Sequence, residues 1–426
     1  MKKIVLVLLS IVLIGCQNSK QKKAVVQKNE KKEDLVIKNW RDLFWKGNSN
    51  EDGYYLINHD GENSYLCYYD YSSKQEVYLC DKPECQHKDE SCTAYLAPPN
   101  LSNMIFVYKD HLYMIQNYGI IINSLGERTE DTAKIIQMDL DGKNRHDLCK
   151  LDEGYEFEYT SLVLGNESLY IPVTKTKNVE MKKNNIMSVV VQKKLYQINL
   201  KSGEAKNIMD MKYKDIIGVN GQNIIMTTMS YSEDPQKYLD QKNYQKYDQI
   251  LMNGKYNYET YNLETKKTKT MSVKLNEQGY YYQNKSYYTK KDGLYSFDFQ
   301  TNQKTKVINL DKNKDYNITF IVDDYVILNE WKDNFIKSYK VSLKNPKLEE
   351  LKQYLRTPKE PVNILAQTKD QLLVLYDREG HDEKTWAGTM QYETTKEYIG
   401  LISIDDFLQG KRNYQQIKTL NDKRRE

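Results

Sequence analysis

Several features of common enzymes and nucleic-acid-binding proteins are missing from this sequence. It contains no G-x-S-x-G, H-E-x-x-H, Walker or G-x-G-x-x-G motif. Only 5 of its 426 residues are histidine, and none lies in an evident nucleophile constellation. The formal net charge is only +4 and no segment forms a basic domain, so a nucleic-acid footprint is absent. These absences predict a protein that is not an enzyme and does not bind nucleic acid.

A long apolar run is also absent, apart from one near the N-terminus. Residues 4–14 are apolar except for Ser10, and they follow Lys2 and Lys3. The run is shorter than the about 20 residues that a membrane-spanning helix needs. A basic start followed by a short apolar stretch is typical of a secretory signal. We therefore expect residues 1–15 to be a signal peptide.

The end of this run resembles the lipobox of bacterial lipoproteins, with Leu13, Ile14 and Gly15 preceding Cys16. The resemblance implies diacylation of the Cys16 thiol, cleavage before it and acylation of the new amino group. More than one acyl chain, palmitate for example, is what durable anchoring requires. We expect a lipoprotein of the cell membrane, on its extracytoplasmic face. The alternative is a plain secreted protein in which Cys16 is incidental.

Residues 16–39 are polar and rich in lysine, and they contain too little apolar surface to order themselves. They are expected to be a flexible tether, and residues 40–426 are expected to be the folded body. Tyrosine is abundant there, with 37 tyrosines in the chain against 8 phenylalanines. Half-exposed strands favour tyrosine, because its ring packs while its hydroxyl reaches water.

A hairpin pattern recurs seven times in the folded body. In each, alternating apolar residues lead into a polar residue and a turn, and a further strand-like run follows. The polar residues are Asp70, Asp139, Asn199, Asn262, Asp298, Ser342 and Ser403. A second hairpin precedes six of these, and a shortened one precedes the first. Repeats of about 40 to 50 residues with four strands each are typical of a β-propeller.

The sequence therefore predicts an all-β protein, a β-propeller of seven blades with four antiparallel strands each. Stacking the sheets radially buries both faces of every sheet, and closing the ring leaves only short edges. Six or eight blades are the alternatives, because the first and last units are the least regular. An irregular pair of β-sandwiches is a further alternative, since sandwiches also space short strands regularly.

The longest segments between the predicted strands each join the second strand of a blade to the third. They are residues 117–134, 174–190, 229–256 and 377–396. Propeller topology brings such connections to one face, and loops grow where binding requires them. Their aromatic side chains can contact sugars, peptides or proteins, although pinning their own loops is the simpler role. The candidate ligand-binding residues are Tyr118, Tyr231, Tyr244 and Trp386.

These observations predict a surface-anchored, non-catalytic protein that binds an extracytoplasmic protein, peptide or glycan through a loop-rich face. The alternative function is an extracytoplasmic propeller hydrolase or lyase that acts on glycan or peptide. Such an enzyme draws its catalytic groups from separate blades around the channel, which a single sequence does not reveal.

One loop, LCDKPECQHKDESCTAYL at residues 79–96, has the most distinctive chemistry. Three thiolates and one imidazole form a good tetrahedral set for Zn²⁺, and a closed four-ligand site is structural rather than catalytic. The candidate ligands are Cys80, Cys85, His87 and Cys92. Disulfides among these cysteines and Cys67 are the alternative outside the cell, and free thiols are a third. Five cysteines follow Cys16, however, and an odd number leaves one unpaired.

The two remaining cysteines, Cys67 and Cys149, lie in strand-like runs and are expected to be small buried hydrophobes. Residues 79–95 are similar to an LCxxPxCxHxxxxCxAY element of a group of bacterial lipoproteins with propeller-like repeats and uncharacterised activity. The matching residues are Cys80, Pro83, Cys85, His87, Cys92, Ala94 and Tyr95. The resemblance implies a propeller and brings no known activity. Strand order places this loop between the first two blades, on the face of the long insertions, where a metal would brace the rim.

Overall fold

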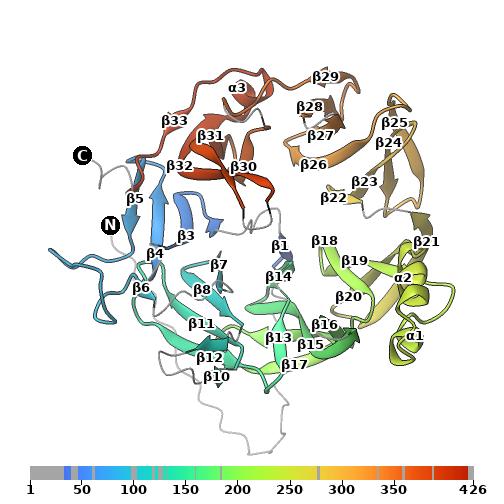
Figure 1. The fold of residues 1–426 in the computed structure, drawn as a ribbon, viewed down its shortest axis with the longest axis horizontal. Helices are drawn as coiled ribbons and strands as arrows, with labels where there is room; N and C mark the ends of the chain where they lie inside the picture. The colour runs from blue at the N-terminus through green and yellow to red at the C-terminus, as the bar shows by residue number, and fades with distance from the viewer. Residues whose placement is uncertain are drawn as a thin grey trace, which may run out of the picture. The chain divides into compact units, whose positions relative to one another are not determined.

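Seven four-stranded antiparallel sheets form the folded body in this computed structural model (Figure 1). Each sheet is one blade, and its strands are called A to D from the central channel outward. The structure describes residues 33–39, 47–59, 63–96, 103–117, 120–122, 128–130, 132–158, 160–182, 185–275, 279–332, 335–356, 360–385 and 388–420.

The first four blades follow one another along the chain. Blade 1 consists of β2 (Gly47–Ser49), β3 (Gly53–His59), β4 (Ser64–Asp70) and β5 (Gln75–Tyr78), with β6 (Tyr95–Leu96) also on β4. Blade 2 consists of β7 (Asn103–Tyr108), β8 (His111–Gln116), β11 (Lys134–Asp139) and β12 (His146–Lys150). Blade 3 consists of β14 (Ser161–Gly165), β15 (Ser168–Lys182), β16 (Asn185–Asn199) and β17 (Ala205–Asp210), with β13 (Tyr155–Phe157) also on β15. Blade 4 consists of β18 (Lys214–Asn220), β19 (Asn223–Ser230), β20 (Lys255–Asn262) and β21 (Lys267–Leu275).

The last three blades repeat the same order. Blade 5 consists of β22 (Tyr280–Tyr282), β23 (Lys285–Lys290), β24 (Gly293–Asp298) and β25 (Lys304–Asn309). Blade 6 consists of β26 (Tyr316–Val322), β27 (Tyr325–Lys332), β28 (Phe335–Ser342) and β29 (Leu348–Glu350). Blade 7 consists of β30 (Asn363–Gln367), β31 (Gln371–Lys384), β32 (Met390–Ser403) and β33 (Gln415–Gln416).

Each interface between consecutive blades has its own apolar core, built from alternating residues of two neighbouring sheets. Between blades 2 and 3, for example, Phe106 and Ile115 pack with Leu162, and all three are fully buried. One cluster joins blade 7 to blade 1, where Leu373 packs with Tyr54. The ring is therefore closed with seven blades, which confirms the predicted fold and excludes the six-blade, eight-blade and sandwich alternatives.

The polar residue at the end of a C strand holds the turn that follows. In four blades its side-chain oxygen accepts hydrogen bonds from the backbone N–H groups two and three residues later. This arrangement is an Asx-turn, which explains why Asp or Asn stands at that position. The residues are Asp70, Asn199, Asn262 and Asp298. Blade 7 differs from the predicted tight turn, because Ser403 instead caps the helix α3 (Ile404–Leu408).

The N-terminal strand β1 (Val36–Asn39) lies inside the ring and pairs antiparallel with β14, the A strand of blade 3 (Figure 1). Just before it, the buried side chain of Leu35 joins the core between blades 3 and 4. The predicted start of the folded body at residue 40 therefore falls after the first strand that belongs to it. Within the described ranges, no helix has the length and apolar character needed to cross a membrane.

The ring closes through the C-terminal residues 415–420, which we call the closing segment. Its strand β33 pairs with β32 of blade 7, and the next residues hydrogen-bond to the outer edge of blade 1. The Lys418 N–H donates to Lys74 O at 2.9 Å, and the Glu76 N–H donates to Lys418 O at 2.9 Å. Between these contacts Ile417 is fully buried in the core shared by blades 7 and 1.

Candidate functional site

The loop with the cysteines is an excursion from the outer strand of blade 1. Both β5 and β6 pair with the outer edge of β4. The Leu79 N–H donates to Leu66 O at 3.0 Å, and the Leu66 N–H donates to Ala94 O at 2.8 Å. Residues 80–93 therefore leave the outer edge of blade 1 after Leu79 and return to it at Ala94. Both ends of this excursion bond to the same residue of β4, Leu66. We call these residues the Cys/His loop.

The four predicted metal ligands come together in this loop. Their side-chain donor atoms lie within 4.8 Å of one another, and Cys92 Sγ lies 3.1 Å from His87 Nδ1. A tetrahedral Zn²⁺ site places its sulfur atoms about 3.8 Å apart, so the arrangement fits this ion. Within the described ranges, this is the one group of three or more His, Cys, Asp or Glu residues close enough to hold a metal.

All five cysteines that the structure describes are free thiols. Cys67 and Cys149 are buried in strands, as predicted, and take no part in the cluster. The His87 ring lies against the Tyr78 ring, with 4.1 Å between centroids, and the backbone of His87 has a left-handed φ of 53°. The loop therefore holds the imidazole beside the thiols through a defined contact with β5.

A metal binds thiolate and neutral imidazole, and the electrostatics of the cluster favour these forms at Cys80 and His87 but not at Cys92. Burial raises the pKa of the Cys80 thiol, but hydrogen bonds from the Lys82 backbone and the other thiols outweigh burial and set the pKa below its usual value. Burial raises the pKa of Cys92 to about 11. Burial lowers the pKa of His87, which favours the neutral ring that coordinates metals.

The Cys/His loop packs against the turn between β11 and β12 of blade 2. Lys143 Nζ lies 2.7 Å from Asp81 Oδ2, and the Arg145 guanidinium donates to the carbonyl oxygens of Thr93 and Tyr95. A Cβ on Gly142, whose φ is +81°, would lie 3.3 Å from two backbone oxygens of the loop region. This turn joins strands C and D of blade 2 and lies on the face opposite the B–C connections. The prediction that the Cys/His loop lies on the rim with the long insertions is therefore wrong. A metal there would brace the outer edge of blades 1 and 2.

The long insertions do join strands B and C, and we call the face that carries the B–C connections the insertion face. Residues 231–254 contain α1 (Gln236–Asp240) and α2 (Tyr244–Met252), and residues 117–133 contain β9 (Ile120–Ile122) and β10 (Arg128–Glu130). The other two insertions are extensions of β15–β16 and β31–β32 into long hairpins. There the two strands of each hairpin pair along their length, with register shifts at a few positions.

Exposed large apolar side chains gather on the insertion face. Seven such residues occur in the described ranges, and five of them lie on B–C connections of blades 3, 4, 6 and 7. They are Val190, Val191, Met252, Trp331 and Met390, of which Met252 is 86% exposed and Trp331 62%. The sequence analysis missed Trp331, although its place between two predicted strands of blade 6 was a usable signal.

A cavity of about 640 Å³ lies on this face between blades 3 and 4. One wall is β16 at residues 189–193, and the other is formed by the link before β18 and by the helical insertion of blade 4. The Tyr213 ring packs edge-on against the Tyr231 ring, with 5.0 Å between centroids, and its hydroxyl donates to Asp234 Oδ1 at 2.7 Å. Aromatic and apolar side chains therefore surround a polar floor.

The floor of this cavity contains a lysine held between two carboxylates. Lys193 Nζ lies 2.8 Å from Glu158 Oε2 and 2.7 Å from Asp215 Oδ1. Burial lowers the pKa of Lys193, but the carboxylates of Asp215 and Glu158 raise it by more than burial lowers it. The pKa of Lys193 therefore lies above its usual value. The ammonium group stays charged, and its charge is neutralised within the protein.

The predicted ligand-binding residues have different positions. Tyr231 lines the cavity, whereas Tyr244 begins α2 and the next turn of that helix contributes Tyr247 to the wall instead. Cys16, Tyr118 and Trp386 lie outside the described residues. The ligand-binding role of these tyrosines and of Trp386 stays a prediction.

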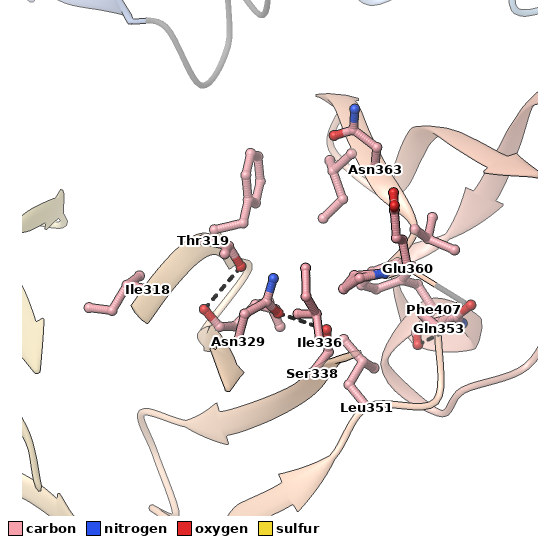
Figure 2. A pocket seen from close by; sticks show the side chains of 15 residues that line it. Ile318, Thr319, Asn329, Ile336, Ser338, Leu351, Gln353, Glu360, Asn363 and Phe407 are labelled. Carbon is pink, nitrogen blue, oxygen red and sulfur yellow. Dashed lines mark hydrogen bonds between the residues drawn. The ribbon is translucent and has the colours of Figure 1, made fainter. Parts of the chain in front are cut away.

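A second cavity, of about 390 Å³, lies between blades 6 and 7 (Figure 2). Its polar side chains are paired with protein groups. Ser338 Oγ donates to Asn329 Oδ1 at 2.7 Å, and Gln353 Nε2 donates to Phe407 O at 3.0 Å (Figure 2). At its mouth Glu360 Oε2 lies 2.8 Å from Arg378 Nη2. Because these groups satisfy one another, this cavity offers less to a ligand than the one on the insertion face.

Comparisons with known proteins show the fold of this chain. No protein-family model and no curated protein matches it. Among solved structures it is similar to a puromycin hydrolase, with a TM-score of 0.51 and 8% identity over 88% of this chain and 53% of the hydrolase. It is also similar to TolB from Acinetobacter baumannii, with a TM-score of 0.34 and 11% identity over 82% of this chain and 76% of TolB. An oligogalacturonate lyase in complex with manganese matches with a TM-score of 0.40 and 8% identity, over 72% and 74% of the two chains.

One of these matches corrects a prediction. The missing catalytic motifs predict a non-catalytic protein, but a puromycin hydrolase has a similar fold. Propellers with this fold therefore occur in enzymes, and a sequence without a local motif does not support the non-catalytic assignment. At 8% identity the likeness to the puromycin hydrolase shows the fold alone.

Proposed function

We propose that this protein is an extracytoplasmic lipoprotein that recognises a ligand with the insertion face of its propeller. The observation that carries the proposal is that five of the seven exposed large apolar side chains among the described residues lie on B–C connections, including Trp331, Met252 and Met390. Trp and Met are enriched at protein interfaces. A cavity with an aromatic wall at Tyr231 lies on the same face. Recognition at this face is required whether the ligand is only bound or is also converted.

The path of β1 shows on which face of the propeller the described chain begins. The Leu35 N–H donates to the carbonyl of Gly221 at 3.3 Å, and Leu35 contacts Gly165. Both glycines lie at turns between strands A and B, on the face opposite the B–C connections. The described chain therefore begins at that opposite face.

We also propose that the Cys/His loop binds one structural Zn²⁺. Cys80, Cys85, His87 and Cys92 would hold the ion with all four coordination positions filled by protein, which leaves none for substrate. The ion would fix the excursion from blade 1 against the Lys143 turn of blade 2. Its role would be to stabilise this outer corner of the propeller.

The anchor is tested by the substitution Cys16→Ser in the producing cell. Loss of the thiol is expected to abolish incorporation of radiolabelled palmitate and to release the protein from the membrane fraction, because no acyl chain is attached. The variant Cys149→Ala removes a buried thiol and is expected to keep the label. Continued labelling of the Cys16→Ser protein would contradict the lipoprotein proposal.

The recognition face is tested by photo-crosslinking in intact cells. A photoreactive amino acid replaces Trp331 or Met390 in one set of variants, and Val77, an exposed residue of β5, in the control. Discrete adducts are expected at Trp331 and Met390 and absent at Val77, because the ligand contacts the insertion face. Equal adducts at all three positions, or none at Trp331 and Met390, would refute the proposed face.

A further inference from the structure

The cavity on the insertion face is lined by the edge of a strand rather than by one of its faces. Five successive residues of β16, 189–193, line it. Because successive side chains of a strand point to opposite faces, five in a row can border one cavity only along the strand's edge. The long axis of the cavity therefore runs beside the backbone of β16.

Among the described residues, the edge of β16 that borders the cavity pairs with β17 only from Lys194 onward. The ladder with β17 ends at Lys194 opposite Asp210, and the last contact is the Met211 N–H donating to Lys193 O at 2.9 Å. The opposite edge of β16 pairs with β15, with a bulge at Val191, which lies between the pairs Gln192–Lys175 and Val190–Thr176. Among the described residues, 189–192 have no partner strand on the cavity side, and Val190 and Val191 are about half exposed. Proteins normally protect such an apolar edge.

The wall across from this edge suits a side chain of moderate size. Met229, Leu251 and the ring of Tyr231 are apolar groups of this wall. Gly254 brings the backbone so close that a Cβ there would lie 2.4 Å from Met229 Cε and 2.7 Å from the Tyr231 ring. The wall is thus a packed surface, and it faces the unpaired backbone across the cavity.

The lining of the cavity contains three acidic residues and three lysines, namely Glu158, Asp210, Asp215, Lys193, Lys212 and Lys214. Lys193 pairs with Glu158 and Asp215, while Lys212 and Lys214 pair with Asp234 and Glu259 at 2.9 and 2.6 Å. Asp210 Oδ1 accepts the Lys212 backbone N–H at 2.7 Å. With Asp234 and Glu259 included, five carboxylates stand against three lysines, so acidic charge is in excess. An acidic glycan or an acidic peptide is therefore disfavoured here.

From these observations we infer that the cavity binds a non-acidic, extended peptide segment of another protein, which adds to residues 189–192 of β16 as a further strand. Backbone hydrogen bonds to the strand edge provide affinity in this mode, and side-chain pockets provide specificity. Alternate side chains of the segment would enter the apolar space beside Met229 and Tyr231. The inference rests on the proposed function and names its ligand class.

The probe for this inference is a display library of random heptapeptides, selected on the full chain in detergent micelles. Enriched heptapeptides are expected to lack acidic residues and to be rich in β-branched and aromatic residues. In a resynthesised binder, N-methylation of the alternate residues that face β16 is expected to weaken binding at least about tenfold, because it removes backbone donors. N-methylation of the other alternate set is expected to change binding less than about twofold, since those groups face away from β16.

Variants of the chain locate the bound peptide. Val191→Pro constrains the bulge of β16 and Val190→Lys adds a charge at the strand edge, and at least one is expected to weaken binding about tenfold. The control Val77→Ser alters an exposed apolar residue of β5, outside the insertion face, and is expected to leave peptide binding unchanged. Folding of each variant is checked by its thermal midpoint.

Three results would overturn the inference. The library yields no binder above background, or both sets of N-methylated peptides bind like the parent, or enriched peptides lose binding with Val77→Ser and not with the β16 variants. The photo-crosslinking at Trp331 and Met390 judges the proposed function separately. Adducts there without peptide binding at β16 would leave the insertion face as the recognition surface and remove only the peptide assignment.

Discussion

A variant carrying Cys85→Ser is expected to bind Zn²⁺ at least about 100-fold more weakly than the natural chain. Removing a hydrogen-bond partner of a metal ligand already lowers metal affinity about 10–100-fold. Cys85 is itself one of the four proposed ligands, so its loss is expected to cost at least as much. Elemental analysis of the purified protein is expected to give one zinc per natural chain and none for the variant. His87→Ala is expected to behave in the same way, because the imidazole completes the set.

The matched control is Cys149→Ser, which alters a thiol outside the cluster and is expected to keep one zinc per chain. Thiol titration in denaturant and chelator separates the alternatives for the natural chain. Five titratable thiols and one zinc support the metal site, since five free cysteines are described. No zinc and fewer than five thiols would establish disulfides instead. Five thiols without zinc would also refute the site.

Removing the metal is also expected to lower the stability of the propeller. An ion present at about 1,000 times its Kd stabilises the folded state by about 4 kcal/mol, provided that it does not bind the unfolded chain. The loss would begin at the outer corner where the Cys/His loop meets Lys143 and Arg145. Hydrogen exchange before and after chelation is expected to show faster exchange first in residues 79–96 and in the turn after β11.

Ile417→Ala is expected to lower the free energy of unfolding by about 2–5 kcal/mol, the usual range for truncating a buried isoleucine. Ile417 is fully buried between blades 7 and 1, and its N–H donates to Ile399 O at 2.8 Å. Its neighbour Lys418 exchanges two backbone hydrogen bonds with the outer strand of blade 1. The substitution therefore weakens the one junction at which the two ends of the ring meet. Urea denaturation measures the loss.

The control for this prediction is Gln416→Ala, in the same segment but with an exposed side chain. Its effect is expected to lie within about 0.5 kcal/mol, as for most surface substitutions. A destabilisation of equal size in both variants would show that the segment acts through its backbone alone. No destabilisation in Ile417→Ala would mean that the closing segment does not hold blade 7 to blade 1.

Features that depend on residues close together in the sequence were predictable. Alternating apolar residues and an Asp or Asn at the turn define each hairpin locally, since Asp70 bonds only to the two or three residues that follow it. The blade number follows from counting such units. The metal cluster was predictable for the same reason, because all four ligands lie within 13 residues, from Cys80 to Cys92.

Other features required contacts between distant residues. Leu420 donates its N–H to Glu76 Oε2 across 344 positions of sequence, and nothing near either residue signals this bond. The place of β1 in the channel depends on Leu35 fitting between blades 3 and 4. From the sequence, the Cys/His loop is expected to link blades 1 and 2. Only the hydrogen bond between Leu66 and Ala94 shows that the loop is an excursion from the outer edge of blade 1.

By itself, the sequence determined the strand pattern, the number of blades and the four members of the Cys/His cluster, because each depends on periodicity or on short spacing. Only the tertiary structure decided which surface is available to a ligand. The cavity on the insertion face exists because the edge of β16 in blade 3 meets Tyr231 and Leu251 of blade 4. Such a contact is set by how neighbouring blades pack, and side-chain packing between distant segments leaves no periodic trace in a single sequence.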